Sequence, residues 1–283
     1  MTERMIETRG IQLCTESFGS PSDPPLLLIM GAVSSMKWWP DPLVEQLVGA
    51  GRFVIRYDHR DTGRSTTQPP GQPRYTVDDM ADDLIAVLDG YGLPRAHLVG
   101  MSLGGMLAQI VALKAPERVR SLTLIAAQFL GDLGFEPPPL SPALLAHFAT
   151  MATLDWRNEA AVLDFMVEAG RLNSSERRPY DVALARRVAA GEFRRSLDIQ
   201  SMMNHASLTG GERWYNRTHA LQAPLLVIHG ALDPVVPYVH GTALSRAVPD
   251  AKLVTLEAAG HELHEADWPV IAEAIITHTR APR

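Results

Sequence analysis

The chain has 283 residues, of which 46% are hydrophobic and 20% charged, a balance typical of an ordinary globular protein. Its formal net charge of −6 excludes a surface that attracts nucleic acid over its whole extent. Cys14 is the only cysteine, which excludes an intramolecular disulfide and a cysteine-based metal centre and fits a reducing compartment. We therefore expect a cytoplasmic protein. Charged residues near the start of the sequence, where a signal peptide would be apolar, and apolar runs well short of the roughly 20 residues of a membrane span lead us to expect no membrane targeting.

Short apolar runs alternate along the chain with amphipathic stretches, an order typical of a parallel sheet covered by helices. The first two runs, 5–7 and 11–15, are separated by Arg9-Gly10 and predict an antiparallel hairpin at the sheet edge. Six further strands are predicted at residues 26–30, 53–57, 97–100, 122–126, 225–229 and 253–256. The sequence therefore predicts an α/β fold with a mostly parallel, eight-stranded sheet.

Three helices are predicted between and after these strands. Thr76 and Asp79 have the spacing of a capping box, and apolar residues follow at helical spacing until Gly92-Leu93-Pro94. A second helix is predicted at 103–114 and a terminal one at 267–279.

The alternation stops at about residue 129 and resumes at about 219. The intervening ninety or so residues have helical patterning and no strand pattern, which predicts a helical insertion. We call residues 129–218 the cap segment and expect residues 1–128 and 219–283 to form the core. The methionine and aromatic side chains of the cap segment suggest an apolar pocket roof, although each of them alone is explained by packing within the cap. Three arginine pairs are expected on solvated helix faces: Arg177-Arg178, Arg186-Arg187 and Arg194-Arg195.

The main chemical signal is a G-x-S-x-G pentapeptide centred on Ser102. It follows a predicted strand and opens a predicted helix, a setting in which a sharp turn exposes a serine hydroxyl. The glycines at 100 and 104 are expected because a Cβ there would collide with the neighbouring strand or helix. A serine at this place also lies at a helix N-terminus, where N–H groups favour an oxyanion. The alternative is a serine that merely caps the helix.

A serine nucleophile needs a base, and the base needs an acid that orients it. Asp233 follows the strand at 225–229, and His261 follows the strand at 253–256, so both lie where open sheets bind ligands. The alternatives are a turn-forming aspartate before Pro234 and an ordinary loop histidine. Asp132 is a weaker candidate for the acid because it lies further from a strand end.

The turn at Ser102, the later Asp233 and the last-loop His261 together resemble the α/β-hydrolase family over about residues 1–128 and 219–283. The resemblance implies the α/β-hydrolase fold with its helical cap, and an oxyanion hole made by the backbone N–H groups of Ala32 and Leu103. Met30 stands where the family usually has a histidine before Gly31-Ala32, which leaves the shape of this loop open.

The segment 56–66 is similar to a turn of the same family, with Asp61 where a glycine is usual. Asp58 and Asp61 are expected to support this turn by hydrogen bonding rather than to act as an acid and base. Together with the Met-Gly opening of the oxyanion loop and the size of the insertion, the segment most resembles methyl-ester hydrolases that trim anthracycline-type aromatic polyketides.

Two other kinds of site are disfavoured by spacing. His261 and His264 do not have the H-E-x-x-H spacing of a zinc site, so we expect no metal, and we expect His264 to be a loop or cap-facing residue. The glycines after residue 99 do not form G-x-G-x-x-G or a P-loop, so we expect no nucleotide and no other cofactor.

The sequence thus predicts a cofactor-free serine hydrolase that acts on a carboxylic ester, with Ser102, His261 and Asp233 as its triad. The expected partner is a small apolar or aromatic ester, with no nucleic acid and no membrane. Lactone hydrolysis, carbon–carbon bond hydrolysis and cofactor-free haloperoxidation use the same triad and stay open, as does a receptor that binds without turnover. The oligomeric state also stays open.

Overall fold

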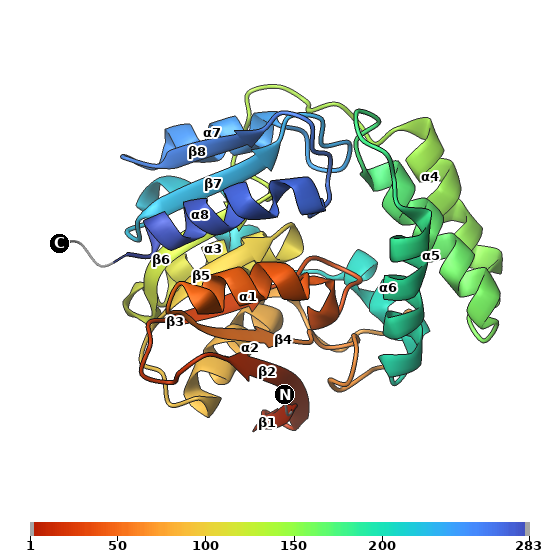
Figure 1. Ribbon diagram of the computed structural model, residues 1–283, viewed down its shortest axis with the longest axis horizontal. Coiled ribbons are helices and arrows are strands. Elements are labelled where there is room, and N and C mark those ends of the chain that lie inside the picture. Colours follow the sequence, from red (N-terminus) through yellow and green to blue (C-terminus); the bar gives the residue numbers. More distant parts are fainter. Residues whose placement is uncertain (1–2, 281–283) are drawn as a thin grey trace.

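The computed structural model describes residues 3–280 and contains the predicted eight-stranded sheet (Figure 1). Its strand order is β1-β2-β4-β3-β5-β6-β7-β8, with β2 antiparallel to both neighbours and β4 to β8 all parallel to β3. The strands are β1 (Arg4–Thr8), β2 (Ile11–Phe18), β3 (Pro25–Ile29), β4 (Phe53–Tyr57), β5 (Ala96–Met101), β6 (Val119–Ile125), β7 (Leu225–Gly230) and β8 (Lys252–Leu256). All eight predicted strands are present, with bounds that differ by at most a few residues.

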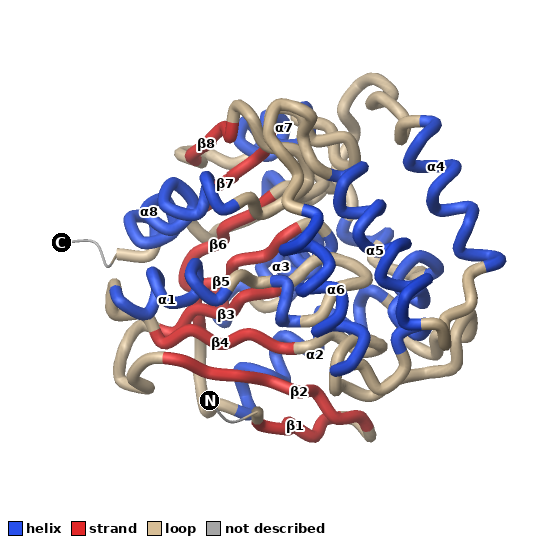
Figure 2. The backbone as a smooth tube through the Cα atoms, turned by 45° about the vertical axis from the view of Figure 1, so that its right-hand side comes forward, coloured by secondary structure: helices blue, strands red, loops and turns tan. Residues whose placement is uncertain are grey.

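Helices cover both faces of the sheet (Figure 2). One face packs against α1 (Asp41–Gly49) and α8 (Trp268–His278), and the other against α2 (Val77–Gly90), α3 (Leu103–Lys114) and α7 (Val239–Ala247). The predicted capping box at the start of α2 is present: Thr76 and Asp79 bond each other's backbone N–H groups. Helices α1 and α7 were not predicted from the sequence, because short helices have weak patterns. Helix α1 buries Leu43, Val44 and Leu47. Helix α7 buries a single large apolar residue, Leu244.

Three more helices lie between β6 and β7: α4 (Pro142–Ala149), α5 (Glu159–Asn173) and α6 (Val182–Arg195). They group together beside one end of the sheet (Figure 1). A separate apolar cluster packs α5 and α6 together with the 3-10 helix that follows them, and it is built mainly from Val162, Leu163, Phe165, Met166, Ala189, Ile199 and Met202. No strand occurs between residues 129 and 218, all of which the structure describes. The division of the chain into a core and a cap segment at these residues stays a prediction.

The carboxyl ends of β5 to β8 are in register, which sets the position of the loops that follow them. Met101 pairs with Ile125, and Ile125 pairs with Ile228. Gly230, two residues on, pairs with Leu256. Because these strands are parallel, the loops that carry Ser102, Asp233 and His261 leave the same edge of the sheet.

Candidate active site

Ser102 occupies a strained turn between β5 and α3. Its backbone has φ 51° and ψ −120°, a sparsely populated conformation for a residue with a side chain. Its N–H donates to Ile125 O at 3.0 Å, which fastens the turn to β6. The Ser102 side chain makes no capping bond to α3, so the alternative of a simple helix cap does not describe this residue.

The two glycines of the pentapeptide are required by close backbone contacts. A Cβ at Gly100 would overlap the carbonyl oxygen of Gly104, and a Cβ at Gly104 would overlap the carbonyl oxygens of Ile29 and Met30. These contacts agree with the collisions expected from the sequence. They also hold the start of α3 close against the end of β3, which brings Ser102 next to the Met30–Ala32 loop.

Asp233 and His261 are hydrogen-bonded to each other. His261 Nδ1 lies 2.8 Å from Asp233 Oδ2, and the Asp233 side chain is fully buried. Asp233 Oδ1 accepts from the N–H groups of Val235 and Val236 at 2.9 and 2.8 Å, so the alternative of a turn-forming aspartate describes this second oxygen. Because Nδ1 of His261 donates to the carboxylate, Nε2 of the same ring is left free. Within residues 3–280, no protein group forms a hydrogen bond with His261 Nε2 or with Ser102 Oγ.

The loop that holds His261 is fastened to the cap segment. The His261 N–H donates to Asn173 O at 2.8 Å, and Glu262 accepts from the N–H groups of Gly260 and Ser175 at 2.8 and 3.4 Å. Burial raises the pKa of Glu262. The contacts with Asn173 and Ser175 could not be predicted from local patterns, because they join segments almost ninety residues apart.

The candidate oxyanion donors also lie beside the serine. A Cβ at Gly31 would lie 3.3 Å from Ser102 Cβ, so the Gly31-Ala32 backbone passes directly next to the serine. Within the described residues, neither the Ala32 N–H nor the Leu103 N–H donates to a protein acceptor. Two free N–H groups near a serine can stabilise negative charge on a substrate oxygen.

Asp58 and Asp61 support the 56–66 turn, as predicted. Asp58 accepts from Met36 N and Arg64 N, each at 2.9 Å. Asp61 has φ 66°, the left-handed conformation that glycine favours and aspartate tolerates, which explains aspartate at a usual glycine position. Its carboxylate accepts from Tyr75 Oη at 2.6 Å and from Asn204 Nδ2 at 2.9 Å.

Arg195 and Arg178 do not lie on solvated helix faces as expected. The Arg195 side chain is 10% exposed and pairs with the buried Asp58 at 2.7 Å. Arg178 forms a two-pronged ion pair with Asp267 of the core. These two arginines therefore join the cap segment to the core, whereas Arg194 is 71% exposed, as predicted.

The remaining candidates, Asp132 and His264, make local turn contacts. Asp132 is exposed and accepts from Gly134 N at 2.7 Å in a local turn. His264 accepts from Ala266 N and caps a short turn.

No group of three or more His, Cys, Asp or Glu side chains in residues 3–280 is arranged to hold a metal ion. Within the same residues, no helix has both the length and the apolarity to cross a bilayer.

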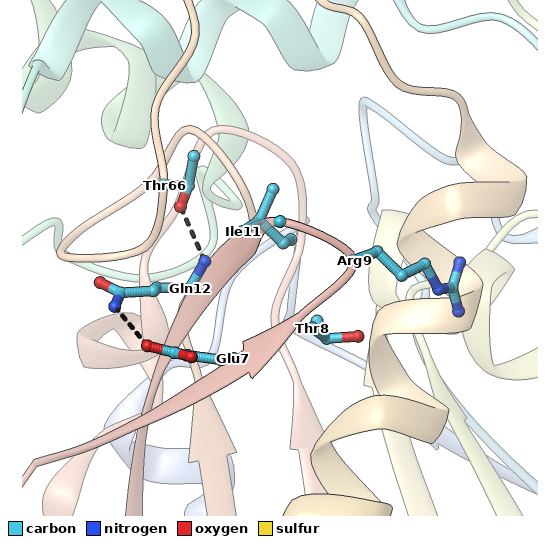
Figure 3. A pocket seen from close by; sticks show the side chains of 7 residues that line it. Glu7, Thr8, Arg9, Ile11, Gln12 and Thr66 are labelled. Carbon is cyan, nitrogen blue, oxygen red and sulfur yellow. Dashed lines mark hydrogen bonds between the residues drawn. The ribbon is translucent and has the colours of Figure 1, made fainter.

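An open hollow lies beside the β1–β2 turn, and Figure 3 shows its polar lining. Gln12 N donates to Thr66 Oγ1 at 2.8 Å, and Gln12 Nε2 donates to Glu7 Oε1 at 3.2 Å. The lining residues are Glu7, Thr8, Arg9, Gly10, Ile11, Gln12 and Thr66. None of the predicted site residues borders this hollow, so it is separate from the candidate active site.

The fold and the Ser102 turn are those of an α/β hydrolase, and the comparison with protein families confirms this class. Residues 24–267 match the model of the alpha/beta hydrolase fold, and the chain belongs to this family. Rhodomycin D methylesterase DnrP of Streptomyces peucetius is 36% identical over 99% of both chains. Rhodomycin D methylesterase DauP of Streptomyces sp. (strain C5) is also 36% identical over 99% of both chains. The predicted resemblance to methyl-ester hydrolases is thus confirmed, and the predicted class of enzyme, a carboxylic ester hydrolase, agrees with both relatives.

Solved structures support the same fold. A hydrolase from Pseudomonas aeruginosa PA01 has a TM-score of 0.74 and 26% identity, covering 99% of this chain and 98% of its own. 2-Hydroxy-6-oxo-6-phenylhexa-2,4-dienoate hydrolase from Rhodococcus sp. strain RHA1 has a TM-score of 0.78 and 21% identity, covering 99% of both chains. At this identity the second likeness concerns the fold alone.

Proposed function

We propose that this ester hydrolase uses Ser102, His261 and Asp233 as a catalytic triad and forms an acyl-enzyme. The observation that carries the proposal is the 2.8 Å bond between Asp233 and His261, on the same sheet edge as the strained Ser102 turn. Asp233 accepts from Nδ1–H, which leaves Nε2 as the base that takes the serine proton. Apo enzymes often lack a tight serine–histidine bond until substrate binds, so the free Ser102 Oγ fits this role.

In the proposed mechanism, Ser102 Oγ attacks the ester carbonyl while His261 Nε2 accepts its proton. The Ala32 and Leu103 N–H groups stabilise the tetrahedral oxyanion. His261 then donates its proton to the leaving alcohol, and the acyl group stays on Ser102. A water that His261 deprotonates releases the acid and restores the serine. Every step is supplied by side chains and backbone groups of this chain, so the proposal needs no cofactor.

For the substrate, we propose a methyl ester on a bulky aromatic scaffold that lies beneath the cap segment, residues 129–218. The support is the full-length identity to two rhodomycin D methylesterases, which includes the cap segment. The apolar cluster of the cap extends to partly buried Trp38 and Val33, next to the proposed oxyanion donor Ala32. An apolar roof close to the reacting centre suits a large aromatic acyl group.

The test is hydrolysis of a panel of methyl esters of polycyclic aromatic acids, measured as the release of methanol and of the free acid. We expect the wild type to turn over repeatedly and Ser102→Ala and His261→Ala to lose about four orders of magnitude in kcat with an unchanged Tm. Lactones and carbon–carbon substrates in the same panel separate the alternative reactions. A folded Ser102→Ala that keeps most of the activity would contradict the proposal, and binding without turnover would indicate a receptor.

A further inference from the structure

The loop of the proposed oxyanion donor has a strained backbone. Val33, which directly follows Ala32, has φ 55°, in the left-handed region that β-branched residues rarely adopt. A residue persists there only where its surroundings hold it. The contacts of the loop on either side of Gly31-Ala32 therefore decide where the Ala32 N–H points.

Two buried histidines hold the loop, one on each side. His59 Nε2 lies 2.8 Å from Met30 O, and the Val33 N–H donates to His205 Nδ1 at 3.0 Å. His59 belongs to the turn after β4, whereas His205 belongs to the 3-10 helix Ile199–Ser207 in the cap segment. The two rings contact each other edge to face, with centroids 5.9 Å apart.

The hydrogen bonds of His205 fix its tautomer. Its Nε2 lies 2.8 Å from Arg60 O, and because a carbonyl oxygen only accepts, Nε2 carries the proton. Nδ1 is then the bare nitrogen, which is what the Val33 N–H requires. A second proton on Nδ1 would oppose that N–H, and burial lowers the pKa of His205, so the ring stays neutral.

The loop has further supports after Val33. Ser35 Oγ donates to the buried Glu192 of α6, and Met36 N donates to Asp58 at 2.9 Å. These contacts hold residues 35 and 36, so among the side chains of the cap segment it is His205 that bonds the backbone next to Ala32.

We propose that His205 is a positioning residue of the oxyanion hole: it holds the Val33 N–H and thereby aims the neighbouring Ala32 N–H at the substrate oxygen. This inference rests on the proposed function. It makes the cap segment part of the catalytic apparatus as well as a roof, because one of its side chains fixes a group that acts in the transition state. It also answers what shapes this loop when Met30 stands in place of a histidine.

A matched pair of variants tests the proposal with p-nitrophenyl butyrate as the substrate. An asparagine amide can replace Nδ1 and a glutamine amide can replace Nε2, so His205→Asn keeps an acceptor for Val33 and His205→Gln keeps a donor for Arg60. We expect His205→Gln to lower kcat about 10- to 100-fold with KM within about threefold, since an oxyanion donor acts in the transition state. His205→Asn is expected to keep kcat within about threefold of the wild type, although it too loses one buried bond.

Inhibition supplies a readout that a purely structural role would not change. An alkyl boronic acid, which forms a tetrahedral adduct, is expected to bind His205→Gln more weakly than the wild type, in proportion to the loss of kcat. The product butyrate is expected to bind both proteins with the same affinity. Each variant tests the proposal by itself if the other fails to fold. Equal kcat losses in both variants, or a rise in KM alone, would overturn the role of His205. A wild type without Ser102-dependent turnover would overturn the proposed function and this inference together.

Discussion

Glu192→Gln is expected to stabilise the protein above neutral pH. Glu192 is 2% exposed, and burial raises its pKa from 4.5 to about 7. The hydrogen bond from Ser35 lowers this pKa, whereas the negative charge of the nearby Asp58 raises it further. The folded state therefore holds a proton that the unfolded chain releases near pH 4.5. The contribution of Glu192 to the free energy of unfolding is therefore highest below pH 4.5 and falls as the pH rises through about 7. The difference corresponds to at most about 3 kcal/mol, at roughly 1.4 kcal/mol per pKa unit.

Glutamine resembles the protonated acid and does not ionise, so the variant avoids this loss. At about 2–4 °C per kcal/mol, we expect the Tm of Glu192→Gln to exceed that of the wild type at pH 8 by up to roughly 10 °C. At pH 4.5 to 5 the two should agree within a degree or two. Thermal unfolding followed by circular dichroism at both pH values measures the difference, with the exposed Glu176→Gln as the matched control in the cap segment. An equal Tm difference at both pH values would show that ionisation of Glu192 does not destabilise the folded protein.

Three further predictions concern the site and the core. Asp233→Asn should lower kcat about 10⁴-fold with little change in KM, because an amide no longer holds the His261 tautomer; steady-state kinetics that show less than a tenfold loss would contradict this role. Gly104→Ala should reduce both Tm and activity, since its Cβ would overlap the Ile29 and Met30 carbonyls, and wild-type values in both assays would count against the turn geometry. Cys14 should resist iodoacetamide in the native protein at pH 8, because burial raises its pKa to about 12; rapid labelling in a mass assay would be inconsistent with that burial.

The fold was predictable because its signals are local. Strand runs that end at glycine or aspartate, the Thr76–Asp79 capping box and the G-x-S-x-G turn each lie within a few neighbouring residues. The grouping of the candidate site residues could be predicted from the topology, since parallel strands bring their carboxyl ends to one edge of the sheet.

What the sequence did not reveal depends on contacts between distant segments. His205 bonds Val33 across 172 residues, and Arg195 pairs with Asp58 where a solvated helix face was expected. No local pattern distinguishes a buried, paired arginine from an exposed one on the same helix, such as Arg194. The positive φ of Val33 is equally invisible, because β-branched residues rarely adopt it.

The most direct test of Ser102 as the nucleophile is the intact mass of the protein after exposure to a fluorophosphonate probe, for the wild type and Ser102→Ala. Such probes react with an activated serine hydroxyl, and peptide mapping locates the adduct. We predict one adduct on the wild type, located on Ser102, and none on the variant. A folded wild type that takes up no probe, or an adduct that persists in Ser102→Ala, would contradict the assignment of Ser102 as the nucleophile.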